Sequence, residues 1–212
     1  MYQPPHFRED RIAAQHALIQ AYPLGLLITA SIDGLVANPI PFTLDATASP
    51  HGTLRAHLAR ANPQIQALMN ATECLVVFQG PNAYVTPSWY ATKHETGKVV
   101  PTWNYATVHI WGQPRVIDDT AWLRMQIDAL TQQHEHDRAQ PWDVEDAPPA
   151  FIDAQLKGII GLELVIVRSE GKWKVSQNRP EADRRGVYAG IRAQGAAGDH
   201  MAELVAQYGK LT

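Results

Sequence analysis

A polar segment in the first third of the chain has the residue types of an anion-binding site. Arg55 and His57 alternate with apolar residues, so a strand would present both on its polar face. Arg60 then precedes Asn62-Pro63, a pair typical of a helix start. Free amides at a helix start favour an anion, and a guanidinium can donate two hydrogen bonds to one phosphate. This corner is therefore predicted to bind phosphate; the alternative is an Arg and a His exposed at a strand end.

Three further segments, at 80–90, 100–105 and 171–179, combine aromatic rings with small polar side chains. A planar ring ligand needs stacking surfaces, with donors and acceptors fixed at its edge. The first two segments offer both, and the third places polar residues at a strand end, where ligand contacts are common. The alternatives are core or interface aromatics for the first two, and a polar strand exit with a helix cap for the third.

Several other kinds of site are disfavoured. His134 and His136 lie two residues apart and would not share a helix face, so a solvated helix end is favoured over a metal site. Cys74 lies in an apolar run and is interpreted as a small buried hydrophobe. The sequence contains no phosphate-binding P-loop, dinucleotide-binding glycine motif or nucleophile elbow, and no basic helix-turn-helix is evident.

The composition is that of one globular domain. The chain has 212 residues, of which 45% are hydrophobic and 18% charged, with a formal net charge of -3. This balance argues against a nucleic-acid-binding surface over the whole molecule. The first residues lack the order of a signal peptide, and no apolar stretch approaches the ~20 residues that span a bilayer. A cytoplasmic protein without membrane contacts is expected.

The elements that would position these segments are mostly short strands. Strands are predicted at 24–31, 35–44, 53–58, 73–78, 104–111, 115–117, 159–167 and 173–175. Helices are predicted at 8–22, 120–135 and 151–156, from Pro63, and weakly from about 180. Turns are predicted at Asp33-Gly34, Gly80-Pro81-Asn82 and Glu170-Gly171, and a loop at 94–98. This order predicts a mainly β protein with flanking helices, in the α+β class, built on a closed antiparallel barrel.

The chain resembles the PaiB family, described as FMN-binding negative transcriptional regulators. The matching segments are 1–7, 39–45, 52–57, 60–63, 78–81, 84–90, 100–105, 109–112, 158–163 and 171–179. The run 104–135 is also similar to part of the split-barrel flavoproteins related to pyridoxamine phosphate oxidase. The resemblance implies a single FMN-binding split β-barrel domain over 1–212, with a helical C-terminal extension from about 180. It also implies a homodimer with FMN at the subunit interface.

The resemblance implies cofactor contacts by matching position. The residues at the phosphate end would be Arg55, His57, Arg60 and Asn62. The residues along the ring and ribityl chain would be Ser88, Trp89, Tyr90, Thr102, Trp103, Asn104 and Tyr105. The residues that reach the site from the partner subunit would be Gln177, Asn178 and Arg179. The resemblance assigns no catalytic residue and no metal.

The implied function is that of a PaiB-type FMN-binding protein, a negative transcriptional regulator that acts directly or indirectly. An alternative is a flavin-dependent oxidoreductase, since the cofactor carries the chemistry. A further alternative is a haem-binding split-barrel protein, in which His57, His94 or His109 would face the haem. The basic residues that grip pyridoxal phosphate in the oxidase relatives have no clear counterpart, which argues against vitamin B6 oxidation. Nothing in the sequence resembles a DNA-binding motif. The sequence therefore does not predict direct DNA binding, and an indirect effect on transcription is the alternative.

Overall fold

The computed structural model describes residues 1–32 and 34–211, and its chain packs as two compact units. The first unit consists of Met1–Gln15, Gln79–Val108 and Glu170–Thr212, and the second of His16–Phe78 and His109–Ser169. Asp33, in one of the predicted turns, lies outside the described residues. Among the described residues, no helix combines the length and the apolar character needed to cross a membrane.

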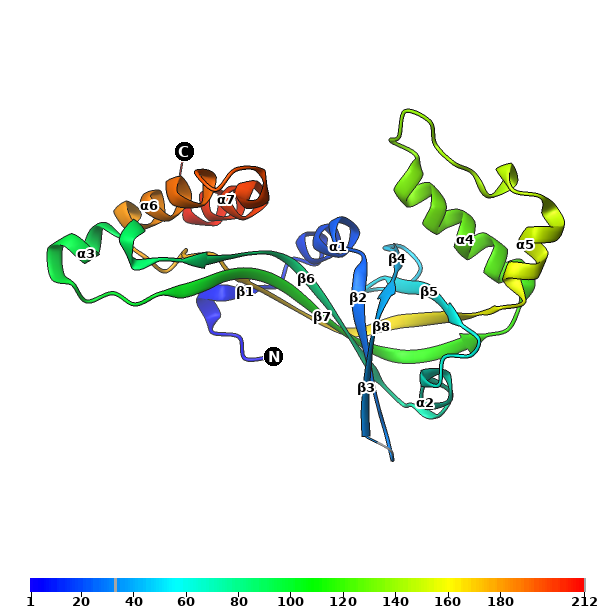
Figure 1. The fold of residues 1–212 in the computed structure, drawn as a ribbon. Helices are drawn as coiled ribbons and strands as arrows, with labels where there is room; N and C mark the ends of the chain where they lie inside the picture. The colour runs from blue at the N-terminus through cyan, green and yellow to red at the C-terminus, as the bar shows by residue number, and fades with distance from the viewer. Residues whose placement is uncertain (33, 212) are drawn as a thin grey trace. The chain divides into compact units, whose positions relative to one another are not determined.

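The strands of the described residues form one eight-stranded sheet (Figure 1). They are β1 (Arg8–Glu9), β2 (Leu24–Ser31), β3 (Gly34–Pro41), β4 (Thr43–Asp45), β5 (Thr53–Ala59), β6 (Cys74–Val85), β7 (Thr102–Ile117) and β8 (Ile159–Lys174). Their order is β3-β2-β6-β7-β8-β5-β4, with β1 paired to β8. The α+β class is confirmed. The sheet is not closed, because β3 and β4 end the strand order among the described residues.

The described residues also form seven α-helices and three short 3-10 turns. The helices are α1 (Ile12–Ala21), α2 (Gln64–Asn70), α3 (Ala91–Thr96), α4 (Thr120–Glu135), α5 (Pro149–Leu156), α6 (Glu181–Arg192) and α7 (Ala196–Gly209). The 3-10 turns are η1 (Pro5–Phe7), η2 (Pro87–Trp89) and η3 (Val144–Asp146).

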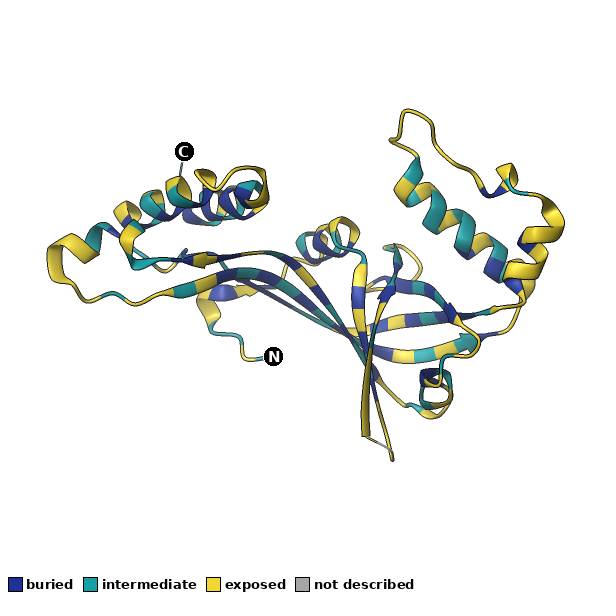
Figure 2. Ribbon diagram, in the orientation of Figure 1, coloured by how far each residue is buried: buried dark blue, intermediate teal, exposed yellow. Residues whose placement is uncertain are grey.

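In the second unit, β5 follows its predicted alternation. Leu54, Ala56 and Leu58 are buried, whereas Arg55 and His57 are only partly buried on the other face (Figure 2). Period-2 alternation in a strand separates the two kinds of side chain because successive residues point to opposite faces. The sequence pattern therefore sets which face of β5 is polar.

The second unit also contains α4 and α5, which pack on each other around a small apolar cluster. The cluster joins Leu123 of α4 to Ile152 and Leu156 of α5, with Val144 between them. The Asp119 side chain caps α4 by accepting a hydrogen bond from the backbone N–H of Trp122 (2.7 Å). The predicted helix at 120–135 is confirmed.

The first unit pairs the C-terminal helices α6 and α7 side by side (Figure 1). Trp89 packs against one face of α6, where Gly186 and Gly190 leave room. A Cβ at Gly186 would overlap the Trp89 carbonyl oxygen, and one at Gly190 would overlap the Trp89 ring. The two glycines therefore serve a close approach between an aromatic residue and a helix.

The turns predicted at Gly80-Pro81-Asn82 and Glu170-Gly171, and the strand end predicted at 111, are wrong. The strands β6, β7 and β8 each continue through the glycine at that point. Gly171 pairs with Glu9 of β1, and a Cβ there would lie 2.7 Å from the Glu9 carbonyl oxygen. A Cβ at Gly112 would overlap the Val165 carbonyl oxygen. These glycines permit close approach of a neighbouring strand and do not form turns. Pro81 lies beyond the part of β6 that pairs with β2, where a missing N–H costs no bond in that ladder.

Three other boundaries also differ. The predicted helix at 8–22 begins only at Ile12, because the preceding residues pair with β8 as β1. The predicted loop at 94–98 is largely α3, which ends at Gly97 in the left-handed region (φ 67°). The predicted strand at 35–44 is split into β3 and β4 between Pro41 and Thr43.

Candidate functional site

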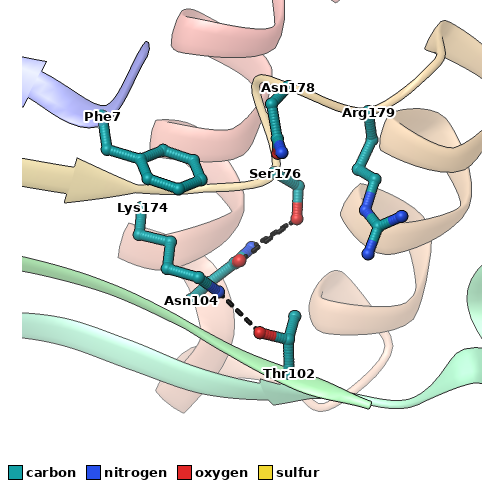
Figure 3. A pocket seen from close by; sticks show the side chains of 7 residues that line it. All are labelled: Phe7, Thr102, Asn104, Lys174, Ser176, Asn178 and Arg179. Carbon is teal, nitrogen blue, oxygen red and sulfur yellow. Dashed lines mark hydrogen bonds between the residues drawn. The ribbon is translucent and has the colours of Figure 1, made fainter. Parts of the chain in front are cut away.

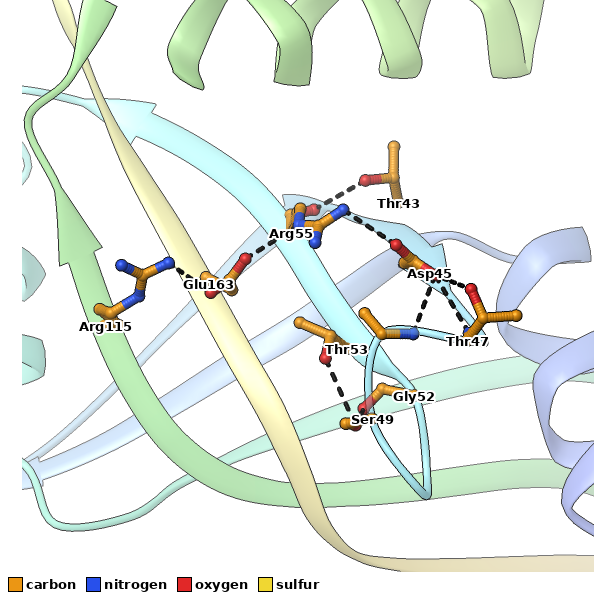
Figure 4. Close-up of polar contacts among 10 residues, drawn as sticks. Thr43, Asp45, Thr47, Ser49, Gly52, Thr53, Arg55, Arg115 and Glu163 are labelled. Carbon is orange, nitrogen blue, oxygen red and sulfur yellow. Dashed lines mark hydrogen bonds and ion pairs between the residues drawn. The ribbon is translucent and has the colours of Figure 1, made fainter. Parts of the chain in front are cut away.

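An ion-pair network crosses the polar face of the second unit and includes Arg55 (Figure 4). Arg55 donates from Nε to Oε2 of Glu163 (2.9 Å) and from Nη1 to Oδ2 of Asp45 (3.2 Å). The other carboxylate oxygen of Glu163 accepts a hydrogen bond from Arg115 (2.6 Å). Arg55 and Glu163 lie directly opposite each other in the β5–β8 ladder, so the sheet register itself creates the pair.

The arginines of this network set the charge state of Glu163. Burial acts to raise the pKa of this carboxyl, but hydrogen bonds from Arg55 and Arg115 outweigh it and hold the pKa below its ordinary value. The pKa of Asp45 is also lowered, mainly by hydrogen bonds from Thr47. Arg55 is thus already paired with two ionised carboxylates, Glu163 and Asp45.

Arg60 lies at the end of β5 and binds Asp118. Its two terminal nitrogens donate to the two oxygens of Asp118 at 2.8 and 2.7 Å, as a bidentate pair. It also donates to the carbonyl oxygens of Lys157 (3.1 Å) and Ile159 (3.0 Å). The side chains of Arg60 and Asp118 are 41% and 65% exposed, so water and salt screen the pair. An incoming phosphate could replace Asp118 as the anion.

The start of α2 has no open amides for an anion. The Asn62 side-chain oxygen accepts a hydrogen bond from the N–H of Gln64 (2.9 Å). The next two N–H groups, of Ile65 and Gln66, donate to the carbonyls of Asn62 (3.2 Å) and Pro63 (3.3 Å). Asn62 therefore orders the helix start, and the corner offers an anion the guanidinium of Arg60 rather than helix amides.

His57 lies beneath α4 and contacts a buried amide. One ring nitrogen, Nδ1, lies 2.6 Å from Oε1 of Gln126, a residue that is 3% exposed. The amide nitrogen of Gln126 is also buried and has no hydrogen-bond partner among the described residues. A buried donor without an acceptor is costly, so this polar face can still take an acceptor.

The predicted ring-lining aromatics belong to the first unit, and two of them are not open surfaces. Tyr90 is 1% exposed, and Trp89 packs on α6. Trp103 is 53% exposed, with its ring edge-on to Tyr84 at 5.9 Å between centroids. Tyr105 lies under the ammonium of Lys172, which is 5.4 Å from its ring centroid. Trp103 is therefore the ring in this group with the largest free face.

A small pocket lies where β8 ends, and we call it the β8-exit pocket. It has a volume of about 170 Å³. Phe7 lies on its apolar side, and its polar lining consists of Thr102, Asn104, Lys174, Ser176, Asn178 and Arg179 (Figure 3). Sequence reasoning missed Phe7, Lys174 and Ser176. Lys174 and Ser176 belong to the polar segment 171–179, and the run of polar residues there was the available signal.

Gln177, a predicted site residue, closes the turn after β8. Its side chain donates to the carbonyl oxygen of Trp173 (2.5 Å) and accepts from the N–H of Val175 (2.8 Å). The neighbouring Ser88, also predicted, is exposed and accepts a hydrogen bond from Lys93 (3.1 Å). Neither side chain lines the β8-exit pocket.

The predicted site residues fall into two groups by unit. All four phosphate-end residues belong to the second unit, and the others belong to the first. Within the described ranges, no cluster of three or more His, Cys, Asp or Glu is arranged to hold a metal ion. His136 is engaged with the Gln132 carbonyl oxygen (2.9 Å) and Asp137 (3.1 Å).

Comparison with known proteins identifies one family and several full-length relatives. The family model described as "Putative FMN-binding domain" matches residues 1–168. An uncharacterized protein of Emericella nidulans is 37% identical over 247 residues, covering 100% of this chain and 98% of the relative. The protease synthase and sporulation protein PAI 2 of Bacillus subtilis is 28% identical over 206 residues, covering 97% of this chain and 96% of the relative.

Solved structures show the same fold at low sequence identity. The flavocytochrome Anf3 of Azotobacter vinelandii is 14% identical, with a TM-score of 0.55, and the match covers 78% of this chain and 67% of that one. This likeness confirms the predicted split-barrel fold.

Proposed function

Because the chain belongs to the FMN-binding family whose model spans residues 1–168, we propose that it is a PaiB-type flavoprotein that influences transcription indirectly. FMN is its cofactor, as predicted. The carrying observation is the family match together with similarity to PAI 2 of Bacillus subtilis over 97% of this chain. The regulatory part of the proposal rests on the name of that relative, a protease synthase and sporulation protein.

The charge distribution supports an indirect effect. Phosphate-backbone contacts need Lys and Arg that are free to replace counterions. Exposed arginines of this chain instead pair with carboxylates, as in Arg8–Asp10 (2.8 Å), Arg115–Glu163 (2.6 Å) and Arg185–Glu181 (2.7 Å). The formal net charge is also -3. A metabolite, a protein partner or the flavin redox state is therefore the expected link to transcription.

The donors at the end of β5 fit the phosphate group of FMN. Arg60 offers a bidentate guanidinium whose present partner, Asp118, is exposed and exchangeable. The buried amide nitrogen of Gln126, beside His57, lacks an acceptor in the part of the chain that the structure describes. We assign Arg60 to hold the phosphate and Arg55 and Asn62 to order the strand and helix around it. Bound FMN would supply reversible electron transfer.

A homodimer is part of the same proposal. Trp103, Tyr84 and Val100 of the first unit are 53%, 47% and 65% exposed, which leaves apolar side chains facing water. A second copy that covered them would remove this surface from solvent and would provide a flat aromatic face for the flavin ring. The dimeric state of the purified protein can be read from its mass in solution.

The proposed function is tested on purified protein with its native cofactor. Denaturation should release a chromophore with the mass and spectrum of FMN. The folded protein should not retard promoter DNA in a sequence-specific manner. Sequence-specific retardation that is lost at modest salt would instead show direct regulation. NADPH or NADH consumption with an added acceptor would support the alternative, a flavin-dependent oxidoreductase.

A further inference from the structure

The β8-exit pocket is positively charged and has no acidic residue in its lining. Lys174 and Arg179 line it, and Lys172 lies two residues before Lys174 on the same face of β8. None of these three forms an ion pair with a carboxylate among the described residues. Arg60 and Arg115 differ from them, because each is paired with a carboxylate. Uncompensated cations around a concave site attract an anion.

The protonation of Lys174 reflects this concentration of positive charge. Burial lowers the pKa of its ammonium, and the nearby charges of Lys172 and Arg179 lower it further. An anion bound in the pocket would offset the repulsion among the three cations. The geometry alone already places two of them at the pocket wall.

Local contacts hold the pocket donors in fixed positions. The Lys174 ammonium donates to the Thr102 hydroxyl (2.6 Å) and the Trp103 carbonyl oxygen (2.5 Å), which leaves its third N–H for a ligand. The side chains of Asn104 and Ser176, both buried, hydrogen-bond to each other at 3.0 and 3.1 Å (Figure 3). Donors fixed in this way lose little entropy when a ligand binds.

The turn after β8 brings Asn178 and Arg179 to the same pocket. Ser176 has φ 66°, in the left-handed region that a non-glycine residue seldom adopts, and this redirects the chain. The Arg179 guanidinium lies 5.0 Å from the centroid of the Tyr90 ring. Burial raises the pKa of the Tyr90 hydroxyl, and the charge and hydrogen bond of Arg179 act against that rise. The turn therefore sets the Arg179 guanidinium between the Tyr90 side chain and the pocket.

We propose that the β8-exit pocket binds a small oxyanion, the carboxylate or phosphate group of an effector or substrate distinct from FMN. Its 170 Å³ is below the roughly 300–1,000 Å³ of pockets that enclose a whole organic cofactor. Lys174, Ser176, Asn178 and Arg179 also lie outside residues 1–168, which the FMN-binding family model matches. The proposal requires only that the FMN phosphate bind outside this pocket, so it stands if the Arg60 assignment alone fails.

Calorimetric titration of the FMN-loaded full chain, at constant ionic strength, tests the proposal. The probes are inorganic phosphate and succinate, with chloride as the reference anion. One of the two should bind saturably, with a dissociation constant at or below about 1 mM. Lys174→Met and Arg179→Gln should each weaken this binding about tenfold or more. Asn178→Leu, at an exposed lining position, should weaken it less and provides a variant that is safe for folding.

The matched control is Arg185→Gln on α6, which removes an exposed arginine that pairs with Glu181 and does not line the pocket. It should leave anion binding unchanged. FMN affinity, measured separately, should be unchanged in the Lys174 variant, whose side chain is not among the expected FMN contacts. If neither probe binds saturably to the wild type, the proposal is overturned. It is also overturned if phosphate displaces FMN and the same variants lose FMN, because the pocket would then hold the FMN phosphate.

Discussion

Replacing Glu163 by Gln removes the carboxylate that Arg55 and Arg115 share, while it preserves the shape of the side chain. The Arg55 hydrogen bond (2.9 Å) joins side chains that are 34% and 13% exposed, so we expect it to contribute about 1–2 kcal/mol. The Arg115 side chain is 65% exposed, so its bond should contribute about 0–1 kcal/mol. The free energy of unfolding at pH 7 should therefore fall by roughly 1–3 kcal/mol.

The difference in the free energy of unfolding between wild type and Glu163→Gln should depend on pH. The pKa of Glu163 is lowered in the folded protein from an ordinary value of 4.5, so the unfolded chain binds the proton more readily. The stabilisation is complete above pH 4.5 and is lost as the pH falls through the lower folded value. The gap between wild type and Glu163→Gln should therefore close in acid.

Urea unfolding followed by tryptophan fluorescence measures both quantities. The control is Glu73→Gln, which removes the same charge from an exposed residue of the second unit and breaks no ion pair among those described. It should change the free energy of unfolding by less than about 0.5 kcal/mol. A Glu163→Gln gap of that small size at pH 7, or a gap that persists unchanged in acid, would refute this account of the network.

Two further predictions concern packing. Gly190→Ala should destabilise the protein by about 1–3 kcal/mol in the same assay, because the new methyl group overlaps the Trp89 ring; Gly→Ala within a helix ordinarily stabilises, so an increase in stability would contradict the contact. Cys74 is buried, and burial followed by the charge of Glu73 raises the pKa of its thiol to about 12. A thiol reagent at pH 8 should label it only after unfolding, and rapid labelling of folded protein would show that the thiol is accessible.

The sequence predicts local structure well where one pattern dominates. The alternation of β5 identifies its polar face, and the helix predicted at 120–135 matches α4 (Thr120–Glu135). At Gly112 and Gly171, the glycine led to the prediction of a strand end or turn that the structure does not have. Both look like strand ends in the sequence, yet both serve strand crossings that depend on residues more than fifty positions away. A turn and a close approach between strands both select glycine, and only tertiary structure distinguishes them.

For a similar reason, the sequence could not reveal which residues meet at the candidate sites. Arg60 is prominent in the sequence because it precedes Asn62-Pro63, but its partner Asp118 lies 58 positions away and could not be inferred. The polar segment 171–179 was predicted either to contact a ligand or to form a polar strand exit, whereas its pocket depends on Phe7 and Thr102 from distant segments. Residue types indicated the chemistry, and the sheet register determined which residues meet.

The most direct test of the central claim is FMN affinity of the apoprotein, measured by flavin fluorescence in wild type, Arg60→Ala and Asp118→Asn. Arg60→Ala should weaken FMN binding by about tenfold to a hundredfold, through loss of a charge-assisted phosphate contact. Asp118→Asn should tighten it, because the guanidinium loses a competing anion. The control is Arg138→Ala, which removes an exposed arginine that pairs with Glu135 at the C-terminal end of α4. Unchanged FMN affinity in folded Arg60→Ala, together with no gain in Asp118→Asn, would contradict the assignment of the FMN phosphate to the end of β5.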